Sequence, residues 1–214
     1  MPVLLRIEKA APPARSALLA AAATAALAVC VDQRAEPDGP WHDAVTAWCS
    51  GRIRKVARRA RGAHWAAVGE LDGITVEVAG AQVRALVPGR VGALDPRVRR
   101  LQISGTELEA DEPAPVDADL PVLWVASELK MSVGKAAAQV GHASMLLAAG
   151  LARTDPGRLG RWHAAGLPCA VRDAAGAHWR SLVADAMAGR AVAVRDAGYT
   201  EVPAGSITVI ATWA

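Results

Sequence analysis

The chain has 214 residues, 52% of them hydrophobic, with seven Trp, one Tyr and no Phe. This length allows one large domain or two domains of roughly 100 residues each. Its three cysteines, Cys30, Cys49 and Cys169, lack CxxC and metal-ligand spacing, which argues against a zinc or disulfide scaffold and fits small core residues in a reducing cytoplasm.

The net charge of +3 hides an uneven distribution. Residues 1–106 carry 15 Lys/Arg and 9 Asp/Glu, residues 107–119 carry six acids and no base, and residues 120–214 carry nine bases and six acids. Two basic regions therefore flank an acidic strip. This pattern suits a polyanionic partner, and ordinary solvated surface remains an open alternative.

The first notable segment is the apolar run Ala17–Val31, which follows Arg6, Lys9 and Arg15. Basic residues before an apolar stretch are typical of a signal peptide, but 15 residues are too few to span a bilayer comfortably. The run consists mainly of Ala, a strong helix former and a weak membrane residue. We therefore predict a buried helix.

The predicted elements follow the same order on both sides of the acidic strip, β-α-α-β-α-β-β. In the first half they are Val3 to Glu8, Ala14 to Val31, Asp43 to Cys49, Ile53 to Arg58, Ala63 to Leu71, Ile74 to Val78 and Val98 to Ser104. In the second half they are Pro121 to Ser127, Gly134 to Leu151, Pro156 to Ala165, Pro168 to Asp173, Ala177 to Ala188, Ala191 to Val194 and Ser206 to Thr212. Each half is thus an α/β domain with a mixed sheet covered by helices on both faces.

The segment between the halves is acidic and rich in Pro, without an apolar period, so it should run as an exposed tether. We assign residues 1–106 to the first domain, 107–120 to the linker and 121–214 to the second domain.

The two halves also share sequence. Gly62-Ala-His-Trp65 recurs as Gly176-Ala-His-Trp179, 114 residues later, and Trp48 precedes Trp162 by the same interval. Further matches occur in the same order, including Val87-Pro-Gly89 with Pro203-Ala-Gly205. Matches in one order with small drifts in spacing indicate a diverged tandem duplication.

The candidate chemistry lies in the second half. Lys130 falls in the turn after the first strand and Lys135 in the first helical turn, where the helix dipole favours anions. Gln139 and His142 follow Lys135 at i+4 and i+7, on one helix face. His142 could be a general base, a phosphate contact or a core histidine satisfied by a backbone carbonyl, and the two lysines could be merely solvated.

A second candidate group follows the strand Ala191 to Val194. Asp196 could be a simple turn residue, or it could hold a lysine or activate water, and Thr200 lies in the same loop.

The second half resembles the type 2 peptidyl-tRNA hydrolases. These proteins carry Asp-Leu-Lys-Met-Gly-Lys-Gly-Lys after a strand, then an Ala-Ala-Gln-x-x-His-Ala helix, then Asp-Ala-Gly-Arg-Thr and Pro-Gly-Ser/Thr-x-Thr-Val. The residues in common are Leu129, Lys130, Met131, Gly134, Lys135, Ala137, Ala138, Gln139, His142, Ala143, Asp196, Ala197, Gly198, Thr200, Gly205, Ser206, Thr208 and Val209. The resemblance implies a three-layer α/β domain that hydrolyses peptidyl-tRNA.

The chain departs from the family pattern at several motif positions. Val133 replaces a lysine and Tyr199 an arginine, so two cations are missing; Glu128 and Ser132 replace Asp and Gly, and Ala204 separates the proline from the glycine. Loss of two cations should weaken binding to RNA and flatten its salt dependence.

The first half lacks the lysine pair, the glutamine and the histidine, and Gly80-Ala-Gln82 stands where the duplication would place Asp196. We expect it to be catalytically silent. It carries six bases between Arg52 and Arg61, among them Arg58 and Arg59, which either contact RNA as a built-in partner of the active half or form a solvated cationic edge strand.

The resemblance therefore implies an esterase acting on peptidyl-tRNA or N-blocked aminoacyl-tRNA, with Lys130, Lys135, Asp196 and His142 as catalytic residues. Gln139, Thr200, Arg58 and Arg59 would bind substrate. We expect a cytoplasmic monomer with an internal pseudo-dimer, tRNA as partner, no membrane contact, and no metal or organic cofactor. A non-catalytic RNA-binding module and a hydrolase of another acyl ester remain the alternatives.

Overall fold

The computed structural model describes residues 1–51, 53–113 and 115–213. The first half contains β1 (Pro2–Arg6), α1 (Arg15–Val31), α2 (His42–Cys49), β2 (Val56–Ala60), α3 (Gly62–Gly69), β3 (Gly73–Val78), β4 (Ala81–Leu86) and α4 (Pro96–Arg99). The second contains β5 (Val122–Ala126), α5 (Val133–Thr154), α6 (Pro156–Ala164), β6 (Ala170–Ala174), α7 (Gly176–Met187), β7 (Val192–Arg195) and β8 (Ile207–Thr212). Short 3₁₀ turns occur at Gln33–Ala35, Val91–Ala93 and Ser127–Leu129.

Each half has one four-stranded mixed sheet, and the strand orders β2-β1-β4-β3 and β6-β5-β8-β7 are equivalent. The registers also correspond. Val3 of β1 pairs with Ala57 of β2 and Ala85 of β4. Leu123 of β5 pairs with Val171 of β6 and Ala211 of β8. The predicted α/β architecture with one mixed sheet in each half is therefore confirmed.

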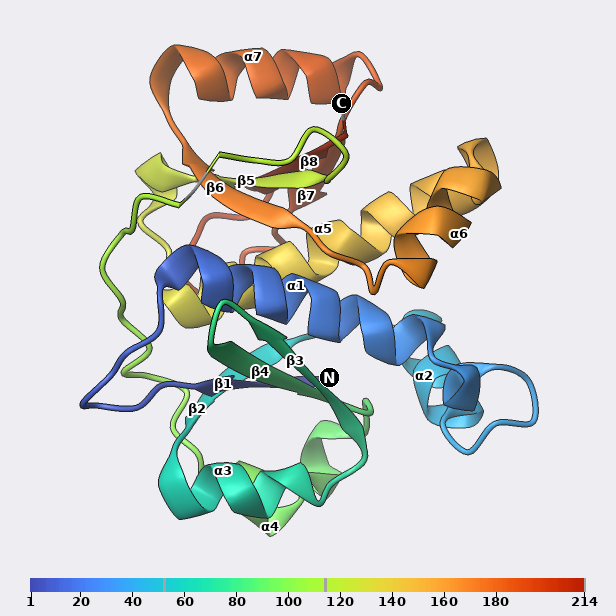
Figure 1. Cartoon of the computed structure of the whole chain (residues 1–214), viewed down its shortest axis with the longest axis vertical. Helices are drawn as coiled ribbons and strands as arrows, with labels where there is room; N and C mark the ends of the chain where they lie inside the picture. The colour runs from blue at the N-terminus through green and yellow to red at the C-terminus, as the bar shows by residue number, and fades with distance from the viewer. Residues whose placement is uncertain (52, 114, 214) are drawn as a thin grey trace.

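The layers follow one another through the molecule (Figure 1). Helix α7 covers the outer face of the second sheet, and α3 and α4 cover the outer face of the first. Helices α1 and α5 lie between the two sheets, in contact with each other. The main hydrophobic core therefore joins the two halves.

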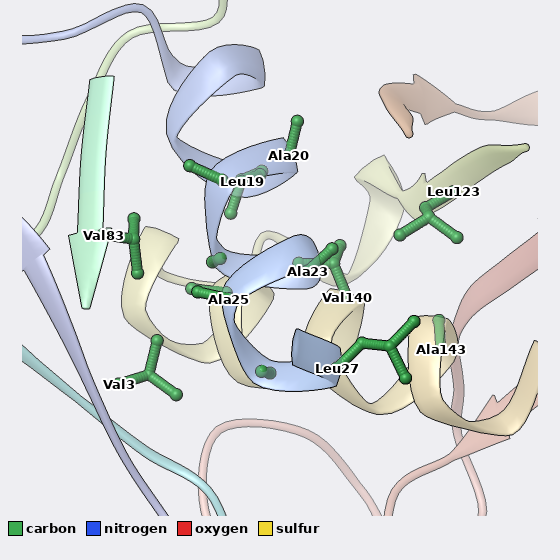
Figure 2. Close-up of a cluster of buried hydrophobic side chains, with 14 of the residues drawn as sticks. Val3, Leu19, Ala20, Ala23, Ala25, Leu27, Val83, Leu123, Val140 and Ala143 are labelled. Atoms are coloured by element: carbon green, nitrogen blue, oxygen red, sulfur yellow. The ribbon is translucent and has the colours of Figure 1, made fainter. Parts of the chain in front are cut away.

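Helix α1 is buried along nearly its whole length, from Ala17 to Leu27. Figure 2 shows Val3 and Val83 on one side of α1, with Val140 and Ala143 of α5 on the other. A helix enclosed on two sides must be apolar all round, and alanine lets its neighbours approach closely. The predicted buried helix is confirmed. Within the described residues, no helix combines the length and apolarity needed to cross a membrane.

The Gly-Ala-His-Trp repeat has the same local structure in both halves. Gly62 and Gly176 open α3 and α7 with φ of +50° and +55°. The N–H of Gly62 donates to Glu8 Oε1 and that of Gly176 to Glu128 Oε1, each at 3.1 Å. Glu8 lies two residues after the end of β1, and Glu128 lies two residues after the end of β5.

The repeated tryptophans also make equivalent contacts. Trp48 Nε1 donates to the carbonyl of Arg54 at 3.1 Å, and Trp162 Nε1 donates to that of Pro168 at 2.8 Å. Each bond joins the second helix of its half to the segment before the next strand. Donor and acceptor are six residues apart in both cases.

The strand predicted at Val98 to Ser104 was wrong. The last strand of the first sheet is β4, and Pro96–Arg99 forms α4, capped by the side chain of Asp95. Ala79 and Gly80 have φ of +46° and +81° and form a two-residue turn that joins β3 directly to β4. A left-handed alanine gives no signal in sequence, so the hairpin was missed. The predicted match of Val87-Pro-Gly89 with residues 203–205 is also wrong, because residues 87–89 follow β4 whereas residues 203–205 precede the equivalent strand β8.

The linker contacts the folded halves more than the predicted exposed tether would. Its described residues form no helix or strand and are mostly exposed. However, both oxygens of Asp111 accept hydrogen bonds from Ser16 at the start of α1, and buried Thr106, just before the linker, accepts the N–H of Gly134 in α5. The chain crosses between the halves close to both helix N-termini.

Candidate active site

The site begins at the N-terminus of α5. Ser132 caps the helix, because its Oγ accepts the N–H of Lys135 at 3.1 Å. The hydroxyl and N–H of Ser132 donate to Glu201 at 2.7 and 2.8 Å, which ties the helix start to the loop between β7 and β8. Lys135 is thereby held in the first turn of the helix.

The loop of residues 196–206 supplies the carboxylate. The N–H of Asp196 donates to Ser206 O at 2.9 Å, and its carbonyl accepts from Gly205 at 2.7 Å. The N–H of Gly198 donates to Asp196 Oδ1 at 2.8 Å, which fixes the carboxylate plane. Gly198 has φ of +78°, and a Cβ there would lie 2.6 Å from Ala204 N, so only glycine fits.

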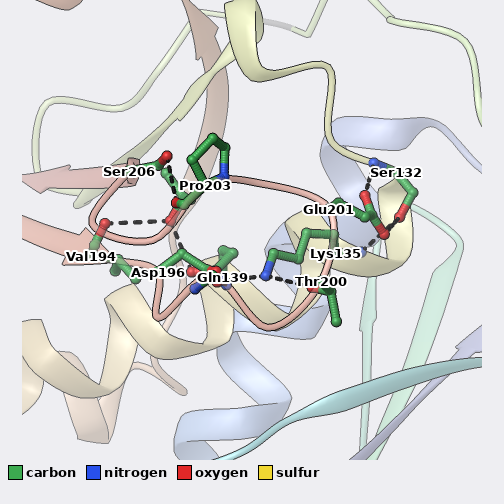
Figure 3. A network of polar contacts seen from close by, with 11 residues as sticks. Ser132, Lys135, Gln139, Val194, Asp196, Thr200, Glu201, Pro203 and Ser206 are labelled. Carbon is green, nitrogen blue, oxygen red and sulfur yellow. Dashed lines mark hydrogen bonds and ion pairs between the residues drawn. The ribbon is translucent and has the colours of Figure 1, made fainter.

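Lys135 and Asp196 form the centre of a polar network (Figure 3). Lys135 Nζ lies 2.5 Å from Asp196 Oδ2 and 2.9 Å from Thr200 Oγ1. Gln139 Nε2 donates to Asp196 Oδ2 at 2.7 Å, and its Oε1 accepts from Thr208 at 2.8 Å. The Lys135 and Asp196 side chains are only 10% and 8% exposed. Four of the predicted site residues therefore meet at one point.

The network keeps Asp196 ionised. Burial raises the pKa of its carboxyl, but the bonds from Lys135, Gly198 and Gln139 together outweigh this effect and lower the pKa below its ordinary value. The result is a charged, rigid acceptor beside an ammonium group.

His142 lies in contact with the N-terminal half. Its Nδ1 is 3.1 Å from Nζ of half-buried Lys55. Burial and the nearby Lys55 lower the pKa of His142 to about 4, and burial lowers the pKa of Lys55 to about 8. A protonated lysine can only donate, so Nδ1 accepts and Nε2 carries the hydrogen. This tautomer presents the Nε2–H of His142 as a hydrogen-bond donor.

Lys130 is placed apart from Lys135. It is exposed, adopts a left-handed conformation with φ of +46°, and lines a pocket of about 220 Å³ with Arg15 and Asp173. Among the described contacts, neither Lys130 nor His142 joins the Lys135–Asp196 network. In the described contacts Lys130 and Lys135 share no partner, so a joint grip on a phosphate stays a prediction.

The side chains of the basic run, residues 52–61, make several different contacts. Arg52 lies outside the described residues. Arg58 Nη1 donates to Leu101 O at 2.7 Å, and Arg59 Nη1 donates to Gly105 O at 2.9 Å. Arg58 also lines a pocket of about 460 Å³ that includes Ser132 and Glu201. The guanidinium of Arg54 lies over the Tyr199 ring, 4.9 Å from its centroid. The N-terminal half therefore reaches the loop that carries Asp196 and Thr200.

Several contributors were not assigned a role from sequence. Thr208 orients Gln139 from β8, Glu201 binds Ser132, and Lys55 binds His142. Thr208 belongs to a family motif, which was a usable signal. The contacts of Glu201 and Lys55 join residues 69 and 87 positions apart and have no local signature.

The groups available for chemistry at this site are protein side chains. In the described part of the chain, no three His, Cys, Asp or Glu residues are grouped so as to hold a metal ion. An ionised carboxylate, an ammonium group, an amide and a hydroxyl are in mutual contact, which suits positioning of water and stabilisation of an oxyanion.

Comparison with known proteins agrees with the motifs. Residues 121–213 match the family model described as Peptidyl-tRNA hydrolase PTH2, and the N-terminal half has no family match. A search of curated proteins found no match. The C-terminal half of this chain therefore matches the peptidyl-tRNA hydrolase PTH2 family, as its motifs predicted.

Proposed function

We propose that the C-terminal half hydrolyses the ester bond of peptidyl-tRNA or N-blocked aminoacyl-tRNA, releasing the peptide and free tRNA. The observation that carries this proposal is the Lys135–Asp196 pair, held by Gln139 and Thr200 at the end of the sheet. The PTH2 match over residues 121–213 supports the substrate class.

In the proposed reaction, Asp196 accepts a hydrogen bond from the attacking water and aligns it with the ester carbonyl. The water oxygen bonds to the carbonyl carbon, and the bond to the ribose oxygen breaks. The water gives up both of its protons: one goes to the ribose oxygen, which leaves as a hydroxyl, and the other goes to solvent, so that the peptide leaves as a carboxylate. Two of the three Lys135 protons bind Asp196 and Thr200, so the third can stabilise the developing oxyanion.

The remaining predicted residues take supporting roles in this proposal. Gln139 holds Asp196, with its amide orientation set by Thr208. His142 donates from Nε2 towards the substrate side, and exposed Lys130 contacts an RNA phosphate. Arg58 contacts RNA from the pocket that it shares with Ser132.

We further propose that the N-terminal half is a diverged and catalytically silent copy, so that the chain is an internal pseudo-dimer. The equivalent strand orders, the two glycine–glutamate contacts and the two tryptophan contacts support common origin. Its two-residue turn at Ala79-Gly80 replaces the loop that carries Asp196, which supports silence.

The decisive assay is single-turnover hydrolysis of N-acetyl-aminoacyl-tRNA by the full chain, run beside a set of small acyl esters and a tRNA-retention measurement. We expect release of the acyl group from tRNA and inhibition of that release by excess deacylated tRNA. Salt-dependent retention of tRNA without turnover would replace the proposal with a non-catalytic RNA-binding module. Turnover of small esters that tRNA does not inhibit would replace it with another esterase.

A further inference from the structure

The tip of the site loop carries an aromatic ring covered by an arginine from the other half. Tyr199 is 65% exposed and directly precedes Thr200, which binds Lys135. The Arg54 guanidinium lies 4.9 Å from the centroid of that ring. A cation of the N-terminal half thus lies at the rim of the C-terminal site.

We propose that the silent half completes the substrate site in cis, with Arg54 binding an RNA backbone phosphate at the rim and Lys55 positioning His142. This inference rests on the proposed function of the same site, because it names the part of the substrate that the N-terminal half binds.

Arg54 is available for a ligand. It is exposed, and no carboxylate in the described part of the chain lies within ion-pair distance of it. Its backbone is held in place, because its carbonyl accepts the indole N–H of Trp48. A guanidinium stacked on an aromatic ring keeps its N–H groups free at the edge, where they can bind a phosphate in a bidentate manner.

Lys55 is more buried than Arg54. It lies against Gly141, since a Cβ on that glycine would be 3.4 Å from the Lys55 side chain, and its ammonium binds His142. This contact fixes the tautomer that leaves Nε2–H as a donor. Gly141 and His142 belong to the α5 segment that also carries Lys135 and Gln139, so the orientation of His142 depends on the other half.

The charge at the loop tip favours a polyanionic ligand, and under the proposed function that ligand is the RNA backbone. Arg54 lies over Tyr199 at the loop tip without a carboxylate partner among the described residues, whereas Asp196 is paired with Lys135 and Glu201 is bound to Ser132. An acyl ester is neutral and needs no cation at the loop tip. A phosphodiester backbone does, and each phosphate neutralised adds to the salt dependence of binding.

The first experiment compares Arg54→Ala with Arg180→Ala. Arg180 is an exposed arginine on α7, in the outer layer beyond the second sheet. Binding of deacylated tRNA is measured over a series of salt concentrations, and the single-turnover rate over a series of substrate concentrations. Arg54→Ala should weaken binding roughly tenfold and reduce the salt slope by about one unit. The rate at saturating substrate should stay within about twofold, which separates binding from chemistry.

The second experiment follows the His142 pKa by NMR titration in the full chain and in Lys55→Met. Burial is the larger cause of the lowered pKa and persists in this variant, so removal of the neighbouring cation should raise the pKa only part of the way from about 4 towards 6.5. An unchanged His142 pKa, or an Arg54→Ala chain that binds tRNA as the Arg180→Ala chain does, would overturn the inference.

The measurement of binding to deacylated tRNA does not depend on hydrolysis. If the wild type binds but does not hydrolyse, the proposed function fails and the role of Arg54 is still decided. If the wild type hydrolyses and Arg54→Ala has no effect on binding, only the inference fails.

Discussion

The two halves of the molecule share a scaffold and differ in one loop and one helix face. Residues 196–206 separate β7 from β8 and carry Asp196, whereas Ala79 and Gly80 alone separate β3 from β4. Counted from the equivalent registers of β1 and β5, the positions of Lys135, Gln139 and His142 correspond to Arg15, Leu19 and Ala22. Leu19 and Ala22 are fully buried.

This difference shows that the fold does not depend on the site. The strand order and the contacts at the repeated Gly and Trp residues persist where the polar face has become core. Function in such a domain lies in a loop and a few side chains placed on a rigid sheet. Arg15 retains a positive charge, but it is paired with Asp173 at 2.5 Å. The N-terminal half therefore has no counterpart of Asp196, because it lacks the loop, and buried Leu19 stands at the position that corresponds to Gln139.

The largest expected effect concerns the carboxylate that only the C-terminal half possesses. Asp196→Asn keeps the side-chain shape and removes the charge that aligns water and holds Lys135. The single-turnover rate on N-acetyl-aminoacyl-tRNA should fall roughly 10²- to 10³-fold. Asp32→Asn, which neutralises an aspartate of the N-terminal half, is the control and should leave the rate within about twofold. Equal rates for the two variants would remove Asp196 from the mechanism.

The next prediction concerns the packing of α1 and α5. It tests whether equivalent core substitutions in the two halves lower the free energy of unfolding equally, and whether the halves unfold together. Leu27 of α1 and Leu147 of α5 occupy corresponding positions and are both buried. Replacing either with Ala should lower the free energy of unfolding by about 2–5 kcal/mol. Because the core is shared, each variant should unfold in one transition, measured by urea titration of tryptophan fluorescence. Two separate transitions would show that the halves are independent.

A smaller effect follows from His142, which has no ionisable counterpart at the corresponding position of the N-terminal half. Its folded-state pKa of about 4 lies below the ordinary 6.5, so the unfolded chain binds more protons between these values. The free energy of unfolding should therefore fall as the pH is lowered from 6.5 to 4. His142→Asn keeps an acceptor for Lys55 and should show a weaker pH dependence in the same urea titrations. Identical pH profiles would contradict the buried, neutral histidine.

The smallest effect concerns the repeated glycines. Gly62→Ala and Gly176→Ala meet open space but force alanine into a left-handed conformation. Each should lower the free energy of unfolding by about 1–2 kcal/mol, equally in the two halves. Gly69→Ala, at a helical glycine in open space, is the control and should be neutral or stabilising. A Gly176→Ala chain as stable as Gly69→Ala would break the equivalence of the two turns.

Much of the scaffold could be predicted from sequence because the patterns that carry it are local. The buried strands, the Ala-rich helix and the Gly-Ala-His-Trp repeat all have short-range signatures. The site residues Lys135, Gln139, Asp196 and Thr200 were also predicted, through helical spacing and motif resemblance. They meet as expected.

The remainder depends on tertiary contacts that no local pattern encodes. The Ala79-Gly80 hairpin requires an alanine in an unfavourable conformation, which only the sheet imposes. The partner of His142 is Lys55, from the other half, and the cation at the loop tip is Arg54. These contacts exist because α1 and α5 pack face to face and so determine which side of each half is buried.

The most direct test compares the two corresponding first-turn cations, Lys135 and Arg15. The full chain, Lys135→Ala and Arg15→Ala are assayed for single-turnover hydrolysis of N-acetyl-aminoacyl-tRNA, with folding checked by circular dichroism. The proposed function predicts that Lys135→Ala loses roughly 10²-fold or more in rate and that Arg15→Ala stays within about threefold of wild type. Hydrolysis that is indifferent to Lys135→Ala, or a wild type with no detectable hydrolysis, would contradict it.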